Sequence, residues 1–185
     1  MIDDVLAFWF GQDPQRWFRP DPAFDDEIRE RFGALHAEAA AGGLDEWRRS
    51  ARGELALILV LDQFSRNLYR DDARAFAQDQ RAQRVARELI ESGRARELSS
   101  VQRWFALMPL MHSEDREQQR VCVAQFEKLL AEIGDDPKVK TALDYARKHA
   151  ELIERFGRFP HRNEVLGRES TPEEKAFLAQ PGSRF

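Results

Sequence analysis

Three short stretches of the sequence carry side chains that could bind a ligand or take part in a reaction. The first stretch follows the apolar run 55–61. On a helix, Asp62 and Arg66 continue one buried row of this run, and Gln63 and Asn67 continue the neighbouring row. Buried polar groups are costly unless they are paired. Two interpretations therefore stay open: an internal network in which Asp62 pairs with Arg66, or a polar row that reaches the floor of a cleft.

The second stretch is a helix start that carries a histidine and a carboxylate, His112 and Glu114. Ser113 is expected to cap this helix, with acidic residues in the first turn. The free N–H groups at a helix start attract anions, so the stretch could also belong to a binding site. Capping by Ser113 alone is the simpler interpretation.

The third stretch is a loop rich in cationic side chains, Arg158, His161 and Arg162, held by Gly157 and Pro160. Guanidinium groups donate forked hydrogen bonds that match carboxylate and phosphate oxygens. Loops on a rigid scaffold are also where functional groups concentrate. The alternative is structural: the arginines bind carbonyl groups at a helix C-terminus and hold down the end of the chain.

The other reactive residue types fit a buried structural role better. His36 and His149 lie in apolar helical rows, which is typical of core histidines that have found a hydrogen-bond partner. Cys122 also lies in an apolar row and is interpreted as a small core residue. The ligand spacings of common metal sites, the glycine-rich phosphate loops and the nucleophile elbow are absent. We therefore expect no metal and no cofactor.

Helix signals are dense along the whole chain and must position these stretches. The helix over 51–67 is apolar on every side of its centre, residues 55–61, and is expected to be the buried central helix. A short helix from Ser100 is expected to break near Pro109. Further helices are expected at 3–10, from Pro22 to Gly42, at 79–92, from Ser113 to Ile133, from Pro137 to Gly157, and after Thr171, about nine in all.

Composition supports one soluble all-α domain over residues 1–185. Val, Ile and Thr together number only 16, which disfavours strands. The net charge of −4 argues against a dedicated nucleic-acid binder and against a polybasic membrane binder. A single cysteine fits a reducing compartment. With no signal peptide and no membrane span in the sequence, we expect a cytoplasmic protein. Its oligomeric state stays open.

Four motifs of the chain are unusual in composition: Val5-Leu6-Ala7-Phe8-Trp9-Phe10-Gly11, Leu61-Asp62-Gln63-Phe64-Ser65-Arg66-Asn67, His112-Ser113-Glu114-Asp115 and Arg158-Phe159-Pro160-His161-Arg162-Asn163. They resemble a bacterial family known as domain of unknown function 924, and the likeness extends over essentially the whole chain. Ser65 departs from the family pattern, in which proline is usual at this position. The resemblance implies an all-helical fold with tetratricopeptide-like stacking of antiparallel helices. It implies no reaction.

We expect the three polar stretches to converge on one ligand-binding cleft. Its predicted lining is Asp62, Gln63, Arg66, Asn67, His112, Glu114, Arg158, His161 and Arg162. The leading hypothesis is a binding module for an anionic small molecule or a peptide terminus, in which the arginines clamp the anion. The alternatives are an enzyme that uses a histidine and a carboxylate as acid and base, and a structural domain for protein interaction.

Overall fold

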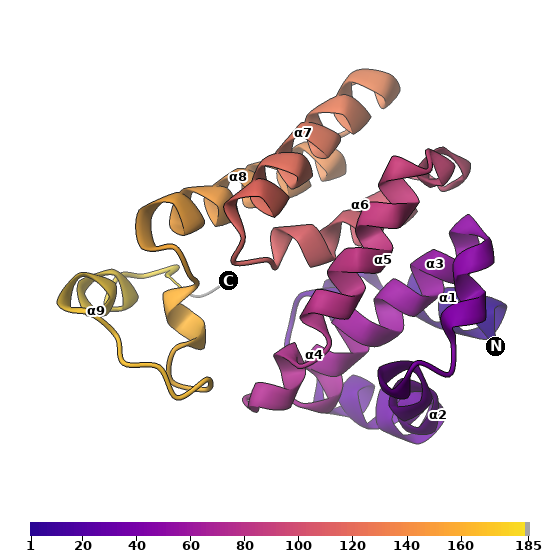
Figure 1. Ribbon diagram of the computed structural model, residues 1–185, viewed down its shortest axis with the longest axis horizontal. Helices are drawn as coiled ribbons and strands as arrows, with labels where there is room; N and C mark the ends of the chain where they lie inside the picture. The colour runs from indigo at the N-terminus through magenta and orange to yellow at the C-terminus, as the bar shows by residue number, and fades with distance from the viewer. Residues whose placement is uncertain (184–185) are drawn as a thin grey trace. The chain divides into compact units, whose positions relative to one another are not determined.

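A computed structural model describes residues 1–183 of the chain, and over these residues it contains helices and no strand (Figure 1). The all-α prediction is confirmed. The α-helices are α1 (Ile2–Phe10), α2 (Pro22–Ala41), α3 (Ala51–Ile58), α4 (Ser65–Leu68), α5 (Asp79–Glu91), α6 (Ser100–Met111), α7 (Arg116–Ile133), α8 (Pro137–Phe156) and α9 (Pro172–Leu178). Short helical turns join them, of which η2 (Asp45–Arg49) and η6 (Pro160–Arg162) contribute side chains discussed below.

The chain divides into two compact units, which are described separately. The first comprises Met1–Arg70 and Arg74–Pro109, and the second comprises Asp71–Ala73 and the chain from Leu110 onwards. The single-domain organisation and the tetratricopeptide-like stacking stay predictions. No helix within residues 1–183 is both long and apolar enough to cross a membrane.

The expected central helix is present in the first unit as α3, a π-helical segment η3 (Leu59–Phe64) and α4, which follow one another without a break. Nearly all of its side chains are buried from Ala51 to Ser65, and α3 packs against α1, α5 and η2. Ser50 caps its start, because the Ser50 hydroxyl accepts a hydrogen bond from the Gly53 N–H at 3.2 Å. A Cβ atom at Gly53 would lie 2.0 Å from the Trp47 carbonyl oxygen, so this close approach requires glycine.

The π-helical turn lies where the polar row leaves the apolar run. It carries Asp62 and Gln63, and directly after it the Ser65 hydroxyl donates to the Leu61 carbonyl at 2.6 Å. The same hydroxyl lies 2.8 Å from Nε2 of the buried His36. Because the Ser65 proton goes to Leu61, Nε2 of His36 must be the donor to Ser65. π-Helical turns are rare and occur frequently at functional sites.

Two predicted helix boundaries are wrong. Pro109 does not break its helix, because α6 continues through it to Met111 and buries every side chain from Phe105 to Met111. The apolar packing of this stretch overrides the local preference of proline. The residue that caps α7 is Asp115 rather than Ser113: its carboxylate accepts from the Gln118 N–H at 2.9 Å.

The second unit contains a helical hairpin followed by a loop region and α9. The hairpin helices α7 and α8 lie side by side, joined by a short turn (Figure 1). The start of α8 is capped by Asp136, and its end is a left-handed glycine, Gly157, as the sequence predicts. Beyond Gly157, the buried Phe159 packs with the end of α8, and this anchors the loop that carries the third polar stretch.

Candidate functional site

The predicted site residues are distributed over both units. Asp62, Gln63, Arg66 and Asn67 belong to the first unit, and His112, Glu114, Arg158, His161 and Arg162 belong to the second. Their convergence on one cleft stays a prediction. The first group consists of carboxylates paired with arginine, and the second also contains a group of neighbouring basic residues.

In the first unit, Arg66 bridges two carboxylates. Its Nη1 atom lies 2.9 Å from Oδ1 of Asp62 and donates to the Asp62 carbonyl at 2.8 Å, and its Nη2 atom lies 3.1 Å from Oδ1 of Asp79. Asp62 is completely buried. Burial alone would lower the pKa of Arg66, but Asp62 and Asp79 outweigh it and raise that pKa above its ordinary value. The cation is therefore locked in place by its partners.

The remaining polar residues of this row are also engaged within the first unit. Nε2 of Gln63 donates to Oδ2 of Asp62 at 2.6 Å. The Asn67 amide donates to Asp25 at 2.7 Å, and Arg70 forms two hydrogen bonds of 2.9 Å with the same carboxylate. The name carboxylate–arginine network is used below for Asp62, Gln63, Arg66, Asn67 and Asp79. Its contacts match the internal pairing of Asp62 with Arg66 considered from the sequence.

In the second unit, Glu114 is held by a residue that the sequence did not single out. Arg168 donates to both carboxylate oxygens, at 2.6 and 2.9 Å, and the Phe159 N–H donates to Oε1 at 2.8 Å. Burial would raise the pKa of Glu114, but these donors and the charge of Arg162 hold it below its ordinary value. Arg168 lies in an irregular loop with no periodic pattern, so nothing in the sequence marked it as the partner.

Arg158 binds the start of α9. It donates from two nitrogens to the two oxygens of Glu174, at 2.7 and 2.8 Å, and to the Glu169 carbonyl at 2.8 Å. Glu174 is buried, and its hydrogen bond from Arg158 is the largest of the effects that together lower its pKa to about 2. A ligand that used Arg158 would have to compete with this carboxylate.

A group of basic residues of the second unit gathers around the ring of Phe159. The rings of His149 and His161 each lie 5.5 Å from it, and the Arg162 guanidinium carbon lies 4.6 Å from its centroid. The His112 ring lies 6.4 Å from that of His149. These residues are called the histidine cluster, and they include three of the four histidines in the chain.

His149 is the buried histidine of the histidine cluster. Nδ1 of His149 lies 2.8 Å from the Tyr145 carbonyl oxygen. Because a carbonyl oxygen can only accept, Nδ1 of His149 is the donor of this hydrogen bond. Burial lowers the pKa of His149 to about 3, and the charges of His112, Arg162 and His161 act in the same direction. The sequence identified His149 as a hydrogen-bonded core histidine, but it did not reveal the surrounding bases.

The metal-ligating and nucleophilic residue types of the described part of the chain, and the start of α7, can be checked against the sequence predictions. Among residues 1–183, no group of three or more His, Cys, Asp or Glu side chains is placed to hold a metal ion. At the start of α7 the Asp115 carboxylate accepts the Gln118 N–H, so the protein itself uses one of the donors considered there for an anion. The sulfur of Cys122 is buried, which raises the pKa of its thiol and keeps it unreactive.

A sequence profile described as a bacterial protein of unknown function (DUF924) matches residues 5–182. The chain belongs to this family. A solved structure of a protein of unknown function from Agrobacterium tumefaciens is similar to it, with 39% sequence identity, a TM-score of 0.86 and 96% of each chain covered. No curated protein matches the chain. The resemblance noted in the four sequence motifs is thus confirmed. It identifies the family and a similar solved structure, and neither has an assigned reaction.

Proposed function

We propose that this protein is a binding module for an anionic small molecule or a peptide terminus, and that the histidine cluster contributes to the site. The observation that carries the proposal is the gathering of basic side chains around His149 and Phe159. The ionisable groups that act on it, His112, Arg162 and His161, are all bases. Such a group of bases produces a positive local potential, which attracts anions.

The surroundings of the histidine cluster support an anion more than a cation. Both oxygens of the nearby carboxylate Glu114 accept hydrogen bonds from Arg168, so the negative charge of Glu114 is balanced locally. The Arg162 side chain is buried and lies over the Phe159 ring, which fixes the plane of its donors. A carboxylate or phosphate would meet a positioned guanidinium fork beside imidazole donors.

The observed geometry gives less support to an enzyme that uses Glu114 as its general acid. Its lowered pKa keeps the carboxyl group ionised at neutral pH, and Arg168 and Phe159 already donate to it. His149 stays neutral at the same pH because its own pKa is about 3. A general acid or base works best with a pKa near the working pH.

The test is binding of carboxylates and phosphate to Arg162→Gln. We expect the wild-type protein to be stabilised by one of these anions in a thermal-shift screen, and titration calorimetry then gives its dissociation constant. Removing the guanidinium should weaken binding by about tenfold or more, the value of a charge-assisted hydrogen bond in a largely buried site. Arg158→Ala is a poorer choice, because it would leave the buried Glu174 without its cation.

Arg155→Gln is the matched control, since it removes the same charge from an exposed arginine of the second unit. Calorimetry is done below the unfolding midpoint of each variant, so a loss of folding is not mistaken for a loss of binding. Equal binding by the wild type and Arg162→Gln would refute the assignment to the histidine cluster. The absence of any anion effect would favour the role in protein interaction.

A further inference from the structure

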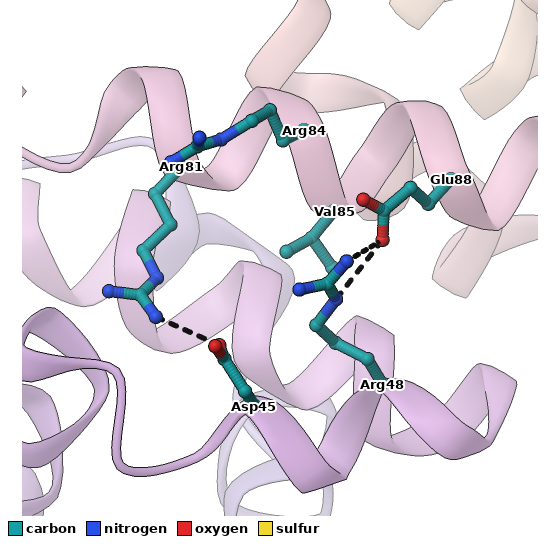
Figure 2. A pocket seen from close by; sticks show the side chains of 6 residues that line it. All are labelled: Asp45, Arg48, Arg81, Arg84, Val85 and Glu88. Carbon is teal, nitrogen blue, oxygen red and sulfur yellow. Dashed lines mark hydrogen bonds and ion pairs between the residues drawn. The ribbon is translucent and has the colours of Figure 1, made fainter.

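The first unit contains a pocket, separate from the histidine cluster, whose lining is dominated by arginine. It has a volume of about 320 Å³ and lies between η2 and α5. Its lining residues are Asp45, Arg48, Arg81, Arg84, Val85 and Glu88 (Figure 2). This volume is at the lower end of the range of small-ligand sites, so it suits a compact ligand.

Two ion pairs that cross between η2 and α5 frame the pocket. Figure 2 shows Arg81 extending from α5 to Asp45, and Arg48 extending from η2 to Glu88. Nη2 of Arg81 lies 2.8 Å from Oδ1 of Asp45, and Arg48 donates from Nε at 3.0 Å and also from Nη2 to a single oxygen of Glu88. The two carboxylates are therefore compensated, and both arginines are positioned by them.

The guanidinium of Arg81 is also fixed from behind by the end of α2. Its Nη1 atom donates to the Ala40 carbonyl at 3.2 Å. Gly42 ends this helix with φ of 93°, and a Cβ atom there would lie 2.9 Å from Nη2 of Arg81. Glycine at this position thus satisfies the left-handed backbone and leaves room for the guanidinium.

Arg84 supplies the charge that the two ion pairs do not balance. It is exposed, and within residues 1–183 no carboxylate lies within ion-pair distance of it. The pocket lining therefore carries three guanidinium groups against two carboxylates, an excess of one positive charge. An arginine has five N–H donors, so donors of Arg48, Arg81 and Arg84 remain available to an anion.

From this arrangement we propose that the pocket binds a phosphoryl group, either as inorganic phosphate or as the phosphate of a small metabolite. Three guanidinium groups from two elements suit a compact oxyanion with several acceptor oxygens, because the N–H donors that remain on each can engage different oxygens. This site is additional to the one proposed at the histidine cluster, and it does not depend on it.

A site-resolved titration tests the proposal. The full-length ¹⁵N-labelled protein is titrated with inorganic phosphate and, separately, with glycerol 3-phosphate at constant ionic strength. We expect amide shifts to concentrate in η2, α5 and the end of α2. Tighter binding of glycerol 3-phosphate would identify a phosphate monoester as the ligand, whereas tighter binding of inorganic phosphate would identify the free ion.

Arg84→Gln should weaken phosphate binding by about tenfold, the cost of losing one charge-assisted contact. Arg87→Gln is the matched control, because Arg87 lies on the same helix, pairs with Glu91 and does not line the pocket. It should change the dissociation constant less than about twofold, the effect of a screened surface charge.

Shifts confined to residues around Phe159 would overturn this inference and leave the proposed function standing. Shifts confined to η2 and α5 would support this inference and would count against phosphate binding at the histidine cluster. Equal weakening by Arg84→Gln and Arg87→Gln would also overturn it, because the pocket would then act only through general electrostatic attraction.

Discussion

The carboxylate–arginine network of the first unit and the histidine cluster of the second solve the burial of polar groups in different ways. In the network, the cation of Arg66 lies between Asp62 and Asp79, so opposite charges compensate one another. In the cluster, the buried His149 has basic neighbours and stays neutral instead. One region keeps its charges by pairing them, and the other avoids a charge at its centre.

This difference indicates which region is better suited to receive a ligand. Removing one member of a buried ion pair leaves the other charge in a nonpolar environment without its counter-charge, which is strongly destabilising. The bases around the neutral His149 lower its pKa, and a positive potential of this kind attracts anions. The network is thus expected to respond to mutation mainly in stability, and the cluster mainly in proton and anion binding.

The largest expected effect is the loss of stability in Arg66→Gln. The substitution leaves the buried carboxylates of Asp62 and Asp79 without their shared cation. Breaking a buried ion pair from one side costs about 3–5 kcal/mol in the free energy of unfolding. Urea denaturation followed by circular dichroism measures this change.

Two further variants show whether the effect comes from the unpaired charge. Asp62→Asn in the Arg66→Gln background should restore part of the stability, because the amide carries no charge. Arg52→Gln removes an exposed arginine that pairs with an exposed Asp3 and should have little effect. A loss below about 1 kcal/mol in Arg66→Gln would mean that the network behaves like a surface pair.

A smaller loss of stability is expected for Arg168→Gln in the second unit. It removes two hydrogen bonds to Glu114, which keeps the Phe159 N–H as a donor and is only partly buried. Hydrogen bonds to a charged group contribute about 1.5–3 kcal/mol, and partial exposure places this variant at the lower end. The same denaturation experiment should rank it below Arg66→Gln; the reverse order would contradict the contrast between the regions.

The third effect depends on pH and follows from the two buried histidines. The folded protein holds the pKa of His149 at about 3, below the ordinary value of 6.5, and burial also lowers that of His36. As the pH falls below 6.5, the unfolded chain takes up these protons more readily. Each neutral histidine therefore makes its full contribution to the free energy of unfolding above pH 6.5. This contribution is lost towards acid pH, by up to about 1.4 kcal/mol per pH unit.

Substitution of each histidine separates the two contributions. His149→Gln should make the decline in unfolding free energy between pH 6 and pH 4 shallower, and His36→Gln should do so in the first unit. Denaturant curves at several pH values measure the slope. An unchanged slope in His149→Gln would show that the histidine is protonated in the folded protein at these pH values.

Local signals explain how much of this arrangement could be predicted from the sequence. The helix starts at Pro22, Pro137 and Pro172 were predictable, because their caps Asp21, Asp136 and Thr171 bind N–H groups two or three residues away. The burial of 55–61 followed from its uniform apolarity. The continuation of α6 through Pro109 depends on packing with distant residues and has no local signal.

The partners of the site residues were harder to predict than their positions. Asp62 and Arg66 are one helical turn apart, so their pairing was visible in the spacing. Arg168 reaches Glu114 from 54 positions along the chain, and the gathering of His112, His149 and His161 depends on how the loop after α8 folds back. The π-helical turn changes the hydrogen-bond register without requiring a particular residue type.

The smallest expected effect is a shift in the pKa of His149 in Arg162→Gln. Because the charge of Arg162 lowers this pKa, its removal should raise it by a few tenths of a pH unit, roughly 0.3–0.5 kcal/mol. The pKa should stay well below 6.5, since burial is the larger cause. An NMR titration of the His149 ring, with the fold monitored by circular dichroism, measures the shift.

The direction of this small shift distinguishes the two descriptions of the histidine cluster. A rise means that Arg162 contributes positive potential at His149, as an anion site requires. Arg155→Gln should leave the pKa unchanged, because Arg155 is exposed and is not among the groups that act on His149. A fall, or no change, in Arg162→Gln would mean that the charge of Arg162 is neutralised at this position. The second unit would then be a paired network like the first, and the contrast in charge that favours anion binding there would disappear.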